Sequence, residues 1–181
     1  MPKALEDLLS KVASILDGTG IDYLVLGGFA LPSYGAIRST VDLDVAVRIG
    51  TEKEFGVFVR AFEKAGFGSG SVGSFSNPVC VFSEGRTGLE VELWLRPDGI
   101  KWDSETLRRR RKARIGSAEV WLVSPEDYVV TKLTRPDRGV QDEKDVKSVL
   151  ERLRGSLDTK YLEKRASRAG VSALLRALEA A

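Results

Sequence analysis

The stretch GGFALPSYGAIRSTVDLDVAV, Gly27 to Val47, decides the fold that we expect for this chain. It ends in VDLDVAV, where apolar residues alternate with aspartates as they do in a half-buried β-strand. Because successive side chains of a strand point to opposite faces, Asp42 and Asp44 share one face and lie about 7 Å apart along it. Leu43 and Val45 then point to the other face, into the core. The stretch therefore predicts a sheet with two carboxylates on a single strand.

Two glycines, Gly27 and Gly28, follow the apolar run IDYLVL and precede a short helix that we expect over residues 29–34. In a strand-to-helix turn of this kind, a glycine lets a phosphate come close to backbone N–H groups at the start of the helix. Two neighbouring carboxylates repel each other, and a divalent cation relieves that repulsion. A phosphate-binding turn beside metal-binding carboxylates is the arrangement used for phosphoryl or nucleotidyl transfer.

A later acidic segment, LEVELWL at residues 89–95, has the same alternation. Glu90 and Glu92 share one face, and one of them can reach the same metal ions if this strand pairs with the one that carries Asp42 and Asp44. The sequence leaves open which glutamate does so. It also leaves open a purely structural explanation, in which all four carboxylates form the solvated face of an amphipathic sheet.

The composition excludes several kinds of catalytic site. The chain has 181 residues, no histidine and a single cysteine, so it has no Ser-His-Asp triad, no Cys-His pair and no imidazole metal ligand. Any metal must be held by carboxylates, which favour Mg²⁺ or Mn²⁺. Cys80 lies in the apolar run PVCVF, and we expect it to be a core thiol. No apolar run reaches the length of a membrane span and the N-terminus is charged, so we expect a cytoplasmic protein without a membrane partner.

The order of the elements predicts the fold class. Strands alternate with helices through GSAEVWLV at residues 116–123, with a capping box at Thr51–Glu54, and the pattern is helical from Ser124 onward. We therefore expect an α/β (α+β) fold in which a small mixed sheet with flanking helices is followed by a helical C-terminal part. The expected domains are a sheet domain over residues 1–123 and a helical subdomain over residues 124–181.

The net charge is only +2, but positive charge is concentrated in RRRRKAR, Arg108 to Arg114. We expect a basic helix or loop from residue 103 to residue 114. Such a run can follow the backbone of an RNA or tRNA acceptor. It can equally be a helix surface that pairs with Asp103 and Glu105. The sequence does not decide between these two interpretations, and it does not predict the oligomeric state.

The pattern of glycines followed by alternating aspartates and a later acidic strand resembles the DNA polymerase β-type nucleotidyltransferase superfamily. The longer string resembles its prokaryotic minimal, abortive-infection toxin-type branch, through Gly27, Gly28, Ala30, Gly35, Arg38, Thr40, Asp42 and Asp44. SPEDYVVTKL at residues 124–133 and VQDEKDVKSVL at residues 140–150 resemble later segments of the same branch. The resemblance spans residues 20–150.

This resemblance implies roles for particular residues. Asp42, Asp44 and Glu92 would be the catalytic residues and the metal ligands, with Mg²⁺ or Mn²⁺ as the cofactor. The groups that would bind the NTP substrate are Gly27, Gly28, Arg38, Thr40 and Lys132.

Two functions follow as hypotheses. In the first, the protein moves a nucleoside monophosphate from an NTP to an acceptor hydroxyl of an RNA, a small molecule or a protein, and releases pyrophosphate. In the second, it is a catalytically inactive nucleotide- or RNA-binding member that acts with a cognate antitoxin protein in a toxin–antitoxin-like system. The position of Glu90 or Glu92 relative to the two aspartates discriminates between them, because a nearby third carboxylate favours an enzyme.

Overall fold

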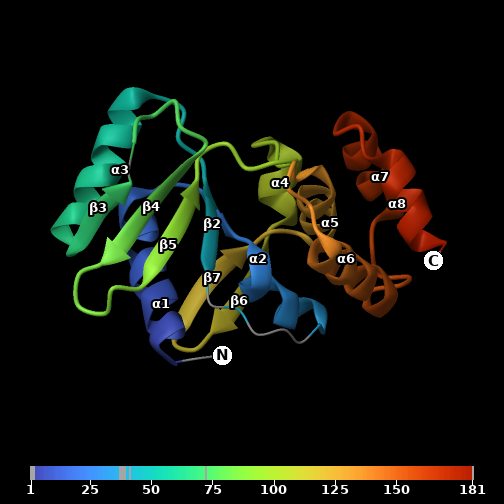
Figure 1. Cartoon of the computed structure of the whole chain (residues 1–181), viewed down its shortest axis with the longest axis horizontal. Coiled ribbons are helices and arrows are strands. Elements are labelled where there is room, and N and C mark those ends of the chain that lie inside the picture. Colours follow the sequence, from blue (N-terminus) through green and yellow to red (C-terminus); the bar gives the residue numbers. More distant parts are fainter. Residues whose placement is uncertain (1–2, 37–39, 41, 72, 181) are drawn as a thin grey trace. The chain divides into compact units, whose positions relative to one another are not determined.

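The computed structural model describes residues 3–36, 40, 42–71 and 73–180. The chain divides into two compact units. The sheet unit comprises Met1–Phe29, Ser39–Pro97 and Arg111–Leu122, and the helical unit comprises Ala30–Arg38, Asp98–Arg110 and Val123–Ala181. This division differs from a single cut after residue 123, because residues 30–38 and 98–110 join the C-terminal helices. Figure 1 labels most of the helices and strands of both units.

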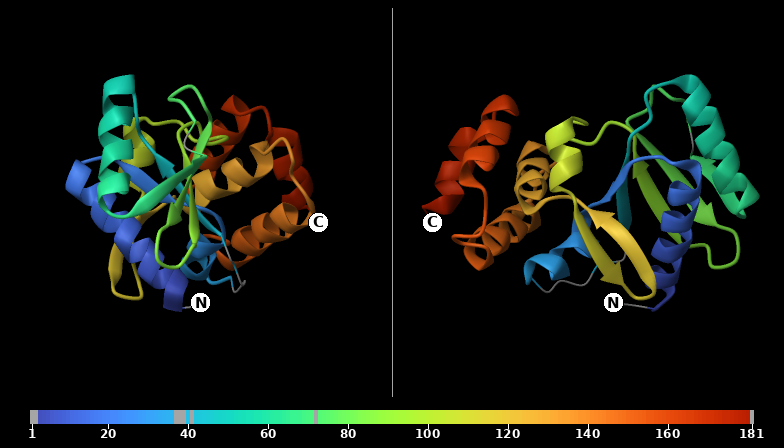
Figure 2. Two further views of the ribbon diagram at one scale, coloured as in Figure 1. Left: turned by 60° about the vertical axis from the view of Figure 1, so that its left-hand side comes forward. Right: turned by 180° about the vertical axis from the view of Figure 1, so that it is seen from behind.

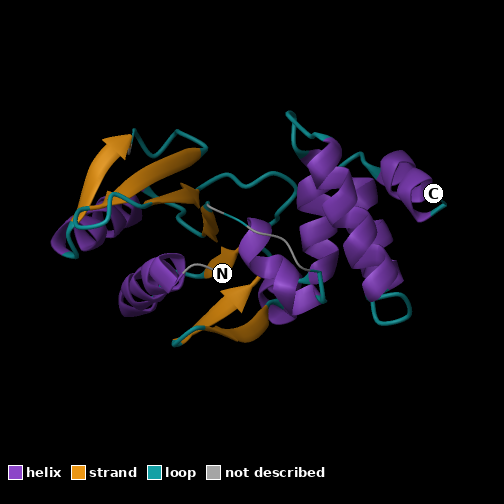
Figure 3. Ribbon diagram, turned by 60° about the horizontal axis from the view of Figure 1, so that its bottom comes forward, coloured by secondary structure: helices purple, strands orange, loops and turns teal. Residues whose placement is uncertain are grey.

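The sheet unit is built on a mixed sheet, as predicted. In the described residues it has seven strands in the order β3-β4-β5-β2-β1-β7-β6. Their bounds are β1 Tyr23–Val25, β2 Leu43–Val47, β3 Phe67–Ser71, β4 Val79–Glu84, β5 Glu90–Trp94, β6 Arg111–Ile115 and β7 Ala118–Leu122. β2 runs parallel to β5 and β1 runs parallel to β7, whereas the other neighbours are antiparallel. Figure 3 shows the strands of this unit in orange.

Two helices of the sheet unit, α1 (Lys3–Thr19) and α3 (Glu52–Lys64), cover one face of the sheet. Their apolar side chains share a core with alternate residues of the strands, and Figure 2 shows both helices from two sides. The capping box predicted at Thr51 and Glu54 begins α3, since each side chain bonds to the backbone N–H of the other residue. Cys80 lies in this core with no exposed surface, and burial raises the pKa of its thiol to about 11. The core position predicted for this cysteine is therefore confirmed.

The helical unit contains α4 (Ser104–Arg109), α5 (Pro125–Thr134), α6 (Val140–Arg152), α7 (Thr159–Arg168) and α8 (Ser172–Glu179), with the 3₁₀ turn Leu31–Tyr34. α5 begins where Ser124 and Pro125 predict, and the Ser124 hydroxyl accepts from the N–H of Asp127. α5 packs on α6 and α7, and α8 packs on the same two helices. The Tyr34 hydroxyl donates to the carbonyl of Val123, which ties the 3₁₀ turn into this unit.

Arg165 organises a buried polar network in the helical unit. Its guanidinium donates to both carboxylate oxygens of Asp103 at 2.8 and 2.7 Å and to the hydroxyl of Tyr161 at 2.7 Å. The Tyr161 hydroxyl in turn donates to Asp127 at 2.9 Å. Asp103 and Arg165 are far apart in the chain, so this network fastens the 98–110 segment to α7.

The basic run Arg108 to Arg114 is not one helix or loop, and that prediction is corrected. Arg108 and Arg109 end α4, whereas residues from Arg111 onward form β6, the edge strand of the sheet. β6 is a strand because it closes a hairpin with β7 around Gly116, whose positive φ of 57° suits a tight turn. The run is thus divided between two elements and between the two units.

A short helix, α2 (Gly27–Ala30), leads directly into the 3₁₀ turn, so the short helix expected over residues 29–34 is present and begins two residues earlier. Within the described ranges, none of the helices combines the length and the apolar composition that crossing a bilayer requires.

Candidate active site

The parallel pairing of β2 and β5 brings two predicted site residues together. Their register places Asp44 opposite Glu92, with Leu43 opposite Val91 and Val45 opposite Leu93. The two apolar pairs belong to the core under α1 and α3, so Asp44 and Glu92 lie on the other face of the sheet. Neighbouring strands are about 4.8 Å apart, so these carboxylates are side by side. The strand pairing on which the sequence argument depended is therefore present.

Glu92, rather than Glu90, is the glutamate that faces β2. Glu90 begins β5, before the first paired residue Val91, and it is exposed. Its carboxylate accepts a hydrogen bond from the hydroxyl of Ser83 on β4 at 3.1 Å. The register thus selects between the two glutamates that the alternation alone leaves equivalent.

Asp42 lies one residue before β2 and is exposed. The Thr40 hydroxyl donates to the backbone carbonyl of Asp42 at 3.2 Å, and Thr40 itself is buried. Thr40 therefore supports the backbone that carries Asp42. Arg38 lies outside the described residues.

The two glycines are packed against residues of this site. A Cβ atom at Gly27, whose φ is +57°, would lie 2.1 Å from Oδ2 of Asp44. A Cβ atom at Gly28 would lie 2.6 Å from Cβ and 2.8 Å from Oγ1 of Thr40. The N–H of Leu26 also donates to the carbonyl of Asp44 at 2.9 Å. Only glycine at these positions lets the turn lie directly over the carboxylate of Asp44 and the side chain of Thr40.

Trp94 is a site residue that the sequence analysis did not identify. Its indole Nε1 lies 3.4 Å from Oδ1 of Asp44. Trp94 ends β5, on the same face as Glu92, because the two residues are separated by one position. The alternation EVELW was the available signal, since it places the tryptophan beside the acidic residues.

Lys132 lies in the helical unit and is buried in an ion pair. Its Nζ atom is 2.7 Å from Oδ1 of Asp142 and 3.5 Å from Oδ2 of Asp145. Burial alone would raise the pKa of Asp142, but the bonds from Lys132 and from the N–H of Gly139 outweigh it and hold that pKa below its usual value. The structure thus joins Lys132 to both aspartates of the VQDEKDVKSVL segment.

The donor set fits a hard divalent cation. Mg²⁺ in nucleotide sites is commonly held by one or two protein carboxylates, with substrate phosphates and water as the remaining ligands. Asp44 and Glu92 supply two adjacent carboxylates, and the bare backbone at Gly27 leaves Asp44 room to lie beside the turn. Within the described part of the chain, no cluster of three or more acidic or cysteine side chains is close enough to hold one ion. Asp42 is accordingly not gathered with the other two.

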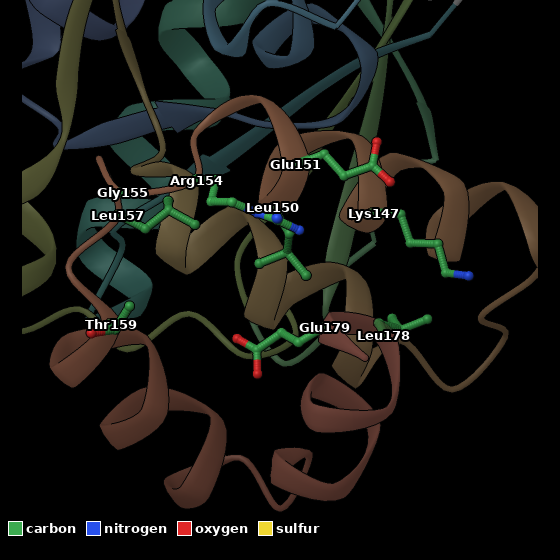
Figure 4. A pocket seen from close by; sticks show the side chains of 9 residues that line it. All are labelled: Lys147, Leu150, Glu151, Arg154, Gly155, Leu157, Thr159, Leu178 and Glu179. Carbon is green, nitrogen blue, oxygen red and sulfur yellow. The ribbon is translucent and has the colours of Figure 1, made fainter. Parts of the chain in front are cut away.

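A cavity of about 330 Å³ lies in the helical unit, remote in sequence from these residues. It is lined by Lys147, Leu150, Glu151, Arg154, Gly155, Leu157, Thr159, Leu178 and Glu179. Figure 4 shows Leu178 and Glu179 of α8 across from Leu150 of α6. Of the predicted site residues that the structure describes, none lines this cavity.

A mixed sheet with paired acidic strands beside a glycine turn fits a nucleotidyl transferase. Residues 5–171 match the family described as "Nucleotidyl transferase of unknown function (DUF2204)", and the chain belongs to this family. It is therefore an enzyme of the nucleotidyltransferase class. The toxin-type branch inferred from the resemblance stays a prediction. No curated protein matches the sequence.

Solved structures of similar fold span nearly the whole chain. An antigenic nucleotidyltransferase-like protein from Paracoccidioides brasiliensis is 21% identical with a TM-score of 0.56, over 98% of this chain and 92% of that one. The antibiotic-resistance factor ANT(2'')-Ia is 16% identical with a TM-score of 0.59, over 96% of each chain. The lincosamide antibiotic adenylyltransferase LnuA is 11% identical with a TM-score of 0.55, over 82% of this chain and 96% of its own. These likenesses confirm the predicted fold class.

Proposed function

We propose that this nucleotidyl transferase moves a nucleoside monophosphate from an NTP to a hydroxyl group of a small molecule, with Mg²⁺ or Mn²⁺ bound by Asp44 and Glu92, and with Asp42 moving in to join them as a ligand when the cation binds. The observation that carries the metal assignment is the register of β2 and β5, which sets Asp44 opposite Glu92 on the face away from the core. A sheet that needed only a solvated face would gain nothing from two adjacent like charges, which are destabilising when directly opposite.

The nucleotide would be bound at the turn beside these carboxylates. The triphosphate would contact backbone N–H groups of this turn, and Thr40 holds the chain at Asp42. The glycines let the turn pack against Asp44 and Thr40, whose side chains fill the space where a Cβ atom would lie. Arg38 and Lys132 are proposed to bind the phosphates. For Lys132 this requires its ion pair with Asp142 to open, which makes its role separately testable.

The reaction is an in-line displacement at the α-phosphorus. The acceptor oxygen forms a bond to that phosphorus, the bond to the oxygen that bridges to the β-phosphate breaks, and pyrophosphate leaves with the electron pair. The proton of the acceptor hydroxyl passes to the carboxylate of Glu92 and then to solvent. Divalent cations, when bound, neutralise charge that develops on the phosphate oxygens.

A small-molecule acceptor is favoured by two observations. The neighbours of similar fold include a lincosamide antibiotic adenylyltransferase with lincomycin bound and ANT(2")-Ia with adenylyl-2"-tobramycin. The basic run proposed to follow RNA is divided between α4 and β6, and Arg109 is engaged with Asp158 at 2.7 Å. The test can also give either of two other results, which are transfer to RNA and nucleotide binding without turnover.

The test is transfer of α-³²P label from each NTP, in Mg²⁺, to lincomycin, tobramycin or tRNA. We expect labelled antibiotic-class product and pyrophosphate from the unmodified protein. Asp44→Asn and Glu92→Gln should each abolish the transfer. Glu90→Gln is the matched control, because Glu90 lies on the same strand but faces Ser83, and it should keep the activity.

If only tRNA becomes labelled, the acceptor is RNA and not a small molecule. Absence of transfer, together with NTP binding that Asp44→Asn does not change, would overturn the metal site itself.

A further inference from the structure

The carboxylate of Asp44 has a different neighbour on each oxygen. Oδ2 lies over Gly27, where a Cβ atom would come within 2.1 Å of it. Oδ1 faces the indole Nε1 of Trp94 at 3.4 Å. The two contacts come from the turn after β1 and from the end of β5, so the side chain of Asp44 is bounded by two separate elements.

The chemistry of indole makes the second contact directional. Indole N–H donates a hydrogen bond and cannot accept one, so it stabilises the ionised carboxylate more than the protonated form. A separation of 3.4 Å is long for a hydrogen bond, but contacts in active sites are often long without ligand and tighten when the substrate binds. Trp94 lies opposite Ala46 on β2 and Val79 on β4, so its backbone is paired on both sides and the ring has a rigid base.

We propose that Trp94 is a positioning residue that orients the carboxylate of Asp44 for cation binding. This inference rests on the proposed function. The indole N–H would engage Oδ1 and fix the orientation of the Asp44 carboxylate toward the cation. Removing a group that hydrogen-bonds to a metal ligand in this way commonly lowers metal affinity or activity by about 10- to 100-fold.

The first experiment measures Mn²⁺ binding without turnover, from the electron paramagnetic resonance signal of free Mn²⁺ in the presence of a non-hydrolysable NTP. We expect Trp94→Phe to raise the Kd for Mn²⁺ by about 10-fold or more. Trp102→Phe is the matched control, because the buried Nε1 of Trp102 has no hydrogen-bond acceptor among the described residues. It should leave the Kd unchanged.

A second replacement separates positioning from packing. Benzothienylalanine at position 94 keeps the shape of the ring system and replaces only the N–H by sulfur. We expect it to weaken Mn²⁺ binding as Trp94→Phe does, with an unchanged Tm. Kinetically, kcat should fall while the KM for the acceptor stays constant, a split that a general loss of packing would not produce.

Unchanged Mn²⁺ affinity in both Trp94 replacements would overturn this inference. Asp44→Asn distinguishes that failure from failure of the proposed function. If Asp44→Asn weakens Mn²⁺ binding and the Trp94 replacements do not, only the role of Trp94 is wrong. If Asp44→Asn has no effect either, the metal does not bind at Asp44, and both proposals fall.

Discussion

On the face of β2 and β5 away from α1 and α3, a carboxylate lies opposite a carboxylate, Asp44 against Glu92. In the helical unit, by contrast, Asp103 lies against Arg165 and Asp142 lies against Lys132, each at 2.7 Å. Buried opposite charges compensate each other and hold a structure in one arrangement. Adjacent like charges instead destabilise a sheet, and in our proposal a bound cation relieves that repulsion. On this proposal, the difference separates residues that stabilise the fold from residues that carry the chemistry.

The largest expected effect on stability comes from Arg165→Met. Arg165 is 3% exposed and binds Asp103, Tyr161 and Asp127, so its removal leaves the buried carboxylate of Asp127 and the half-buried carboxylate of Asp103 without their cation. We expect the free energy of unfolding to fall by about 3–5 kcal/mol, measured by urea denaturation. Arg168→Met, an exposed position on the same helix, should change it by no more than about 0.5 kcal/mol. If Arg165→Met and Arg168→Met lower the free energy of unfolding equally, the network around Arg165 does not stabilise the fold as we expect.

Lys132→Met tests whether the second ion pair belongs to stability alone. Breaking a buried pair costs about 3–5 kcal/mol, because the carboxylates of Asp142 and Asp145 stay buried. Lys132→Met/Asp142→Asn should recover part of that loss. In the double variant the KM for NTP isolates nucleotide binding, and we expect it to rise because the proposed phosphate ligand is gone. An unchanged KM would leave Lys132 with a structural role only.

Gly27→Ala should damage the site more than the fold. The new Cβ atom would displace the carboxylate of Asp44, and a misplacement of about 1 Å can lower a rate by about 100-fold. Alanine in the left-handed region also costs about 1–2 kcal/mol of stability. Gly20→Ala is the matched control, since Gly20 has a φ of +69° and nothing within 4 Å of its Cβ position. It should show the same stability loss with full activity; equal activity in both variants would contradict the role of Gly27.

The smallest expected effect is a loss of stability in acid. A hydrogen bond from Lys11, followed by one from the N–H of Thr87, lowers the pKa of Glu84 from 4.5 to about 2. The hydrogen bond from Arg165 similarly lowers the pKa of Asp103 from 3.8 to about 2. Because the folded-state pKa values lie below the unfolded ones, the stabilisation is complete above pH 4.5 and is lost as the pH falls toward 2.

This pH dependence can be measured by urea denaturation between pH 2 and pH 6. Glu84→Gln should flatten the curve in this interval by removing the contribution of the sheet unit, while Asp103 still contributes. An identical curve in Glu84→Gln would show that Glu84 adds nothing to acid sensitivity.

Much of the fold follows from local pattern. The alternation of VDLDVAV and LEVELWL predicts both acidic strands and their faces, and the hydroxyl caps at Thr51 and Ser124 predict where α3 and α5 begin. These features depend on residues a few positions apart, which a single sequence displays directly.

The rest depends on contacts between distant segments. The choice of Glu92 over Glu90 needed the register of β2 against β5, and the contact of Trp94 with Asp44 needed the diagonal between those strands. The basic run looked like one element because its charges are contiguous. Its division at Arg110 follows from the hairpin of β6 with β7, whose pairing the charges do not encode.

The interior position of β1 in the sheet also has a consequence for how the chain is made. β1 ends at Val25, and it pairs with β2 on one side and with β7, through Leu122, on the other. During synthesis from the N-terminus, a nascent chain can complete β2 and β5 while the second edge of β1 still awaits its partner. The sheet is complete only after the β6–β7 hairpin has left the ribosome. The pairing of β1 with β7 joins residues that are far apart in the sequence, which slows folding. Until then, the unpaired edge of β1 is open to pairing with another strand.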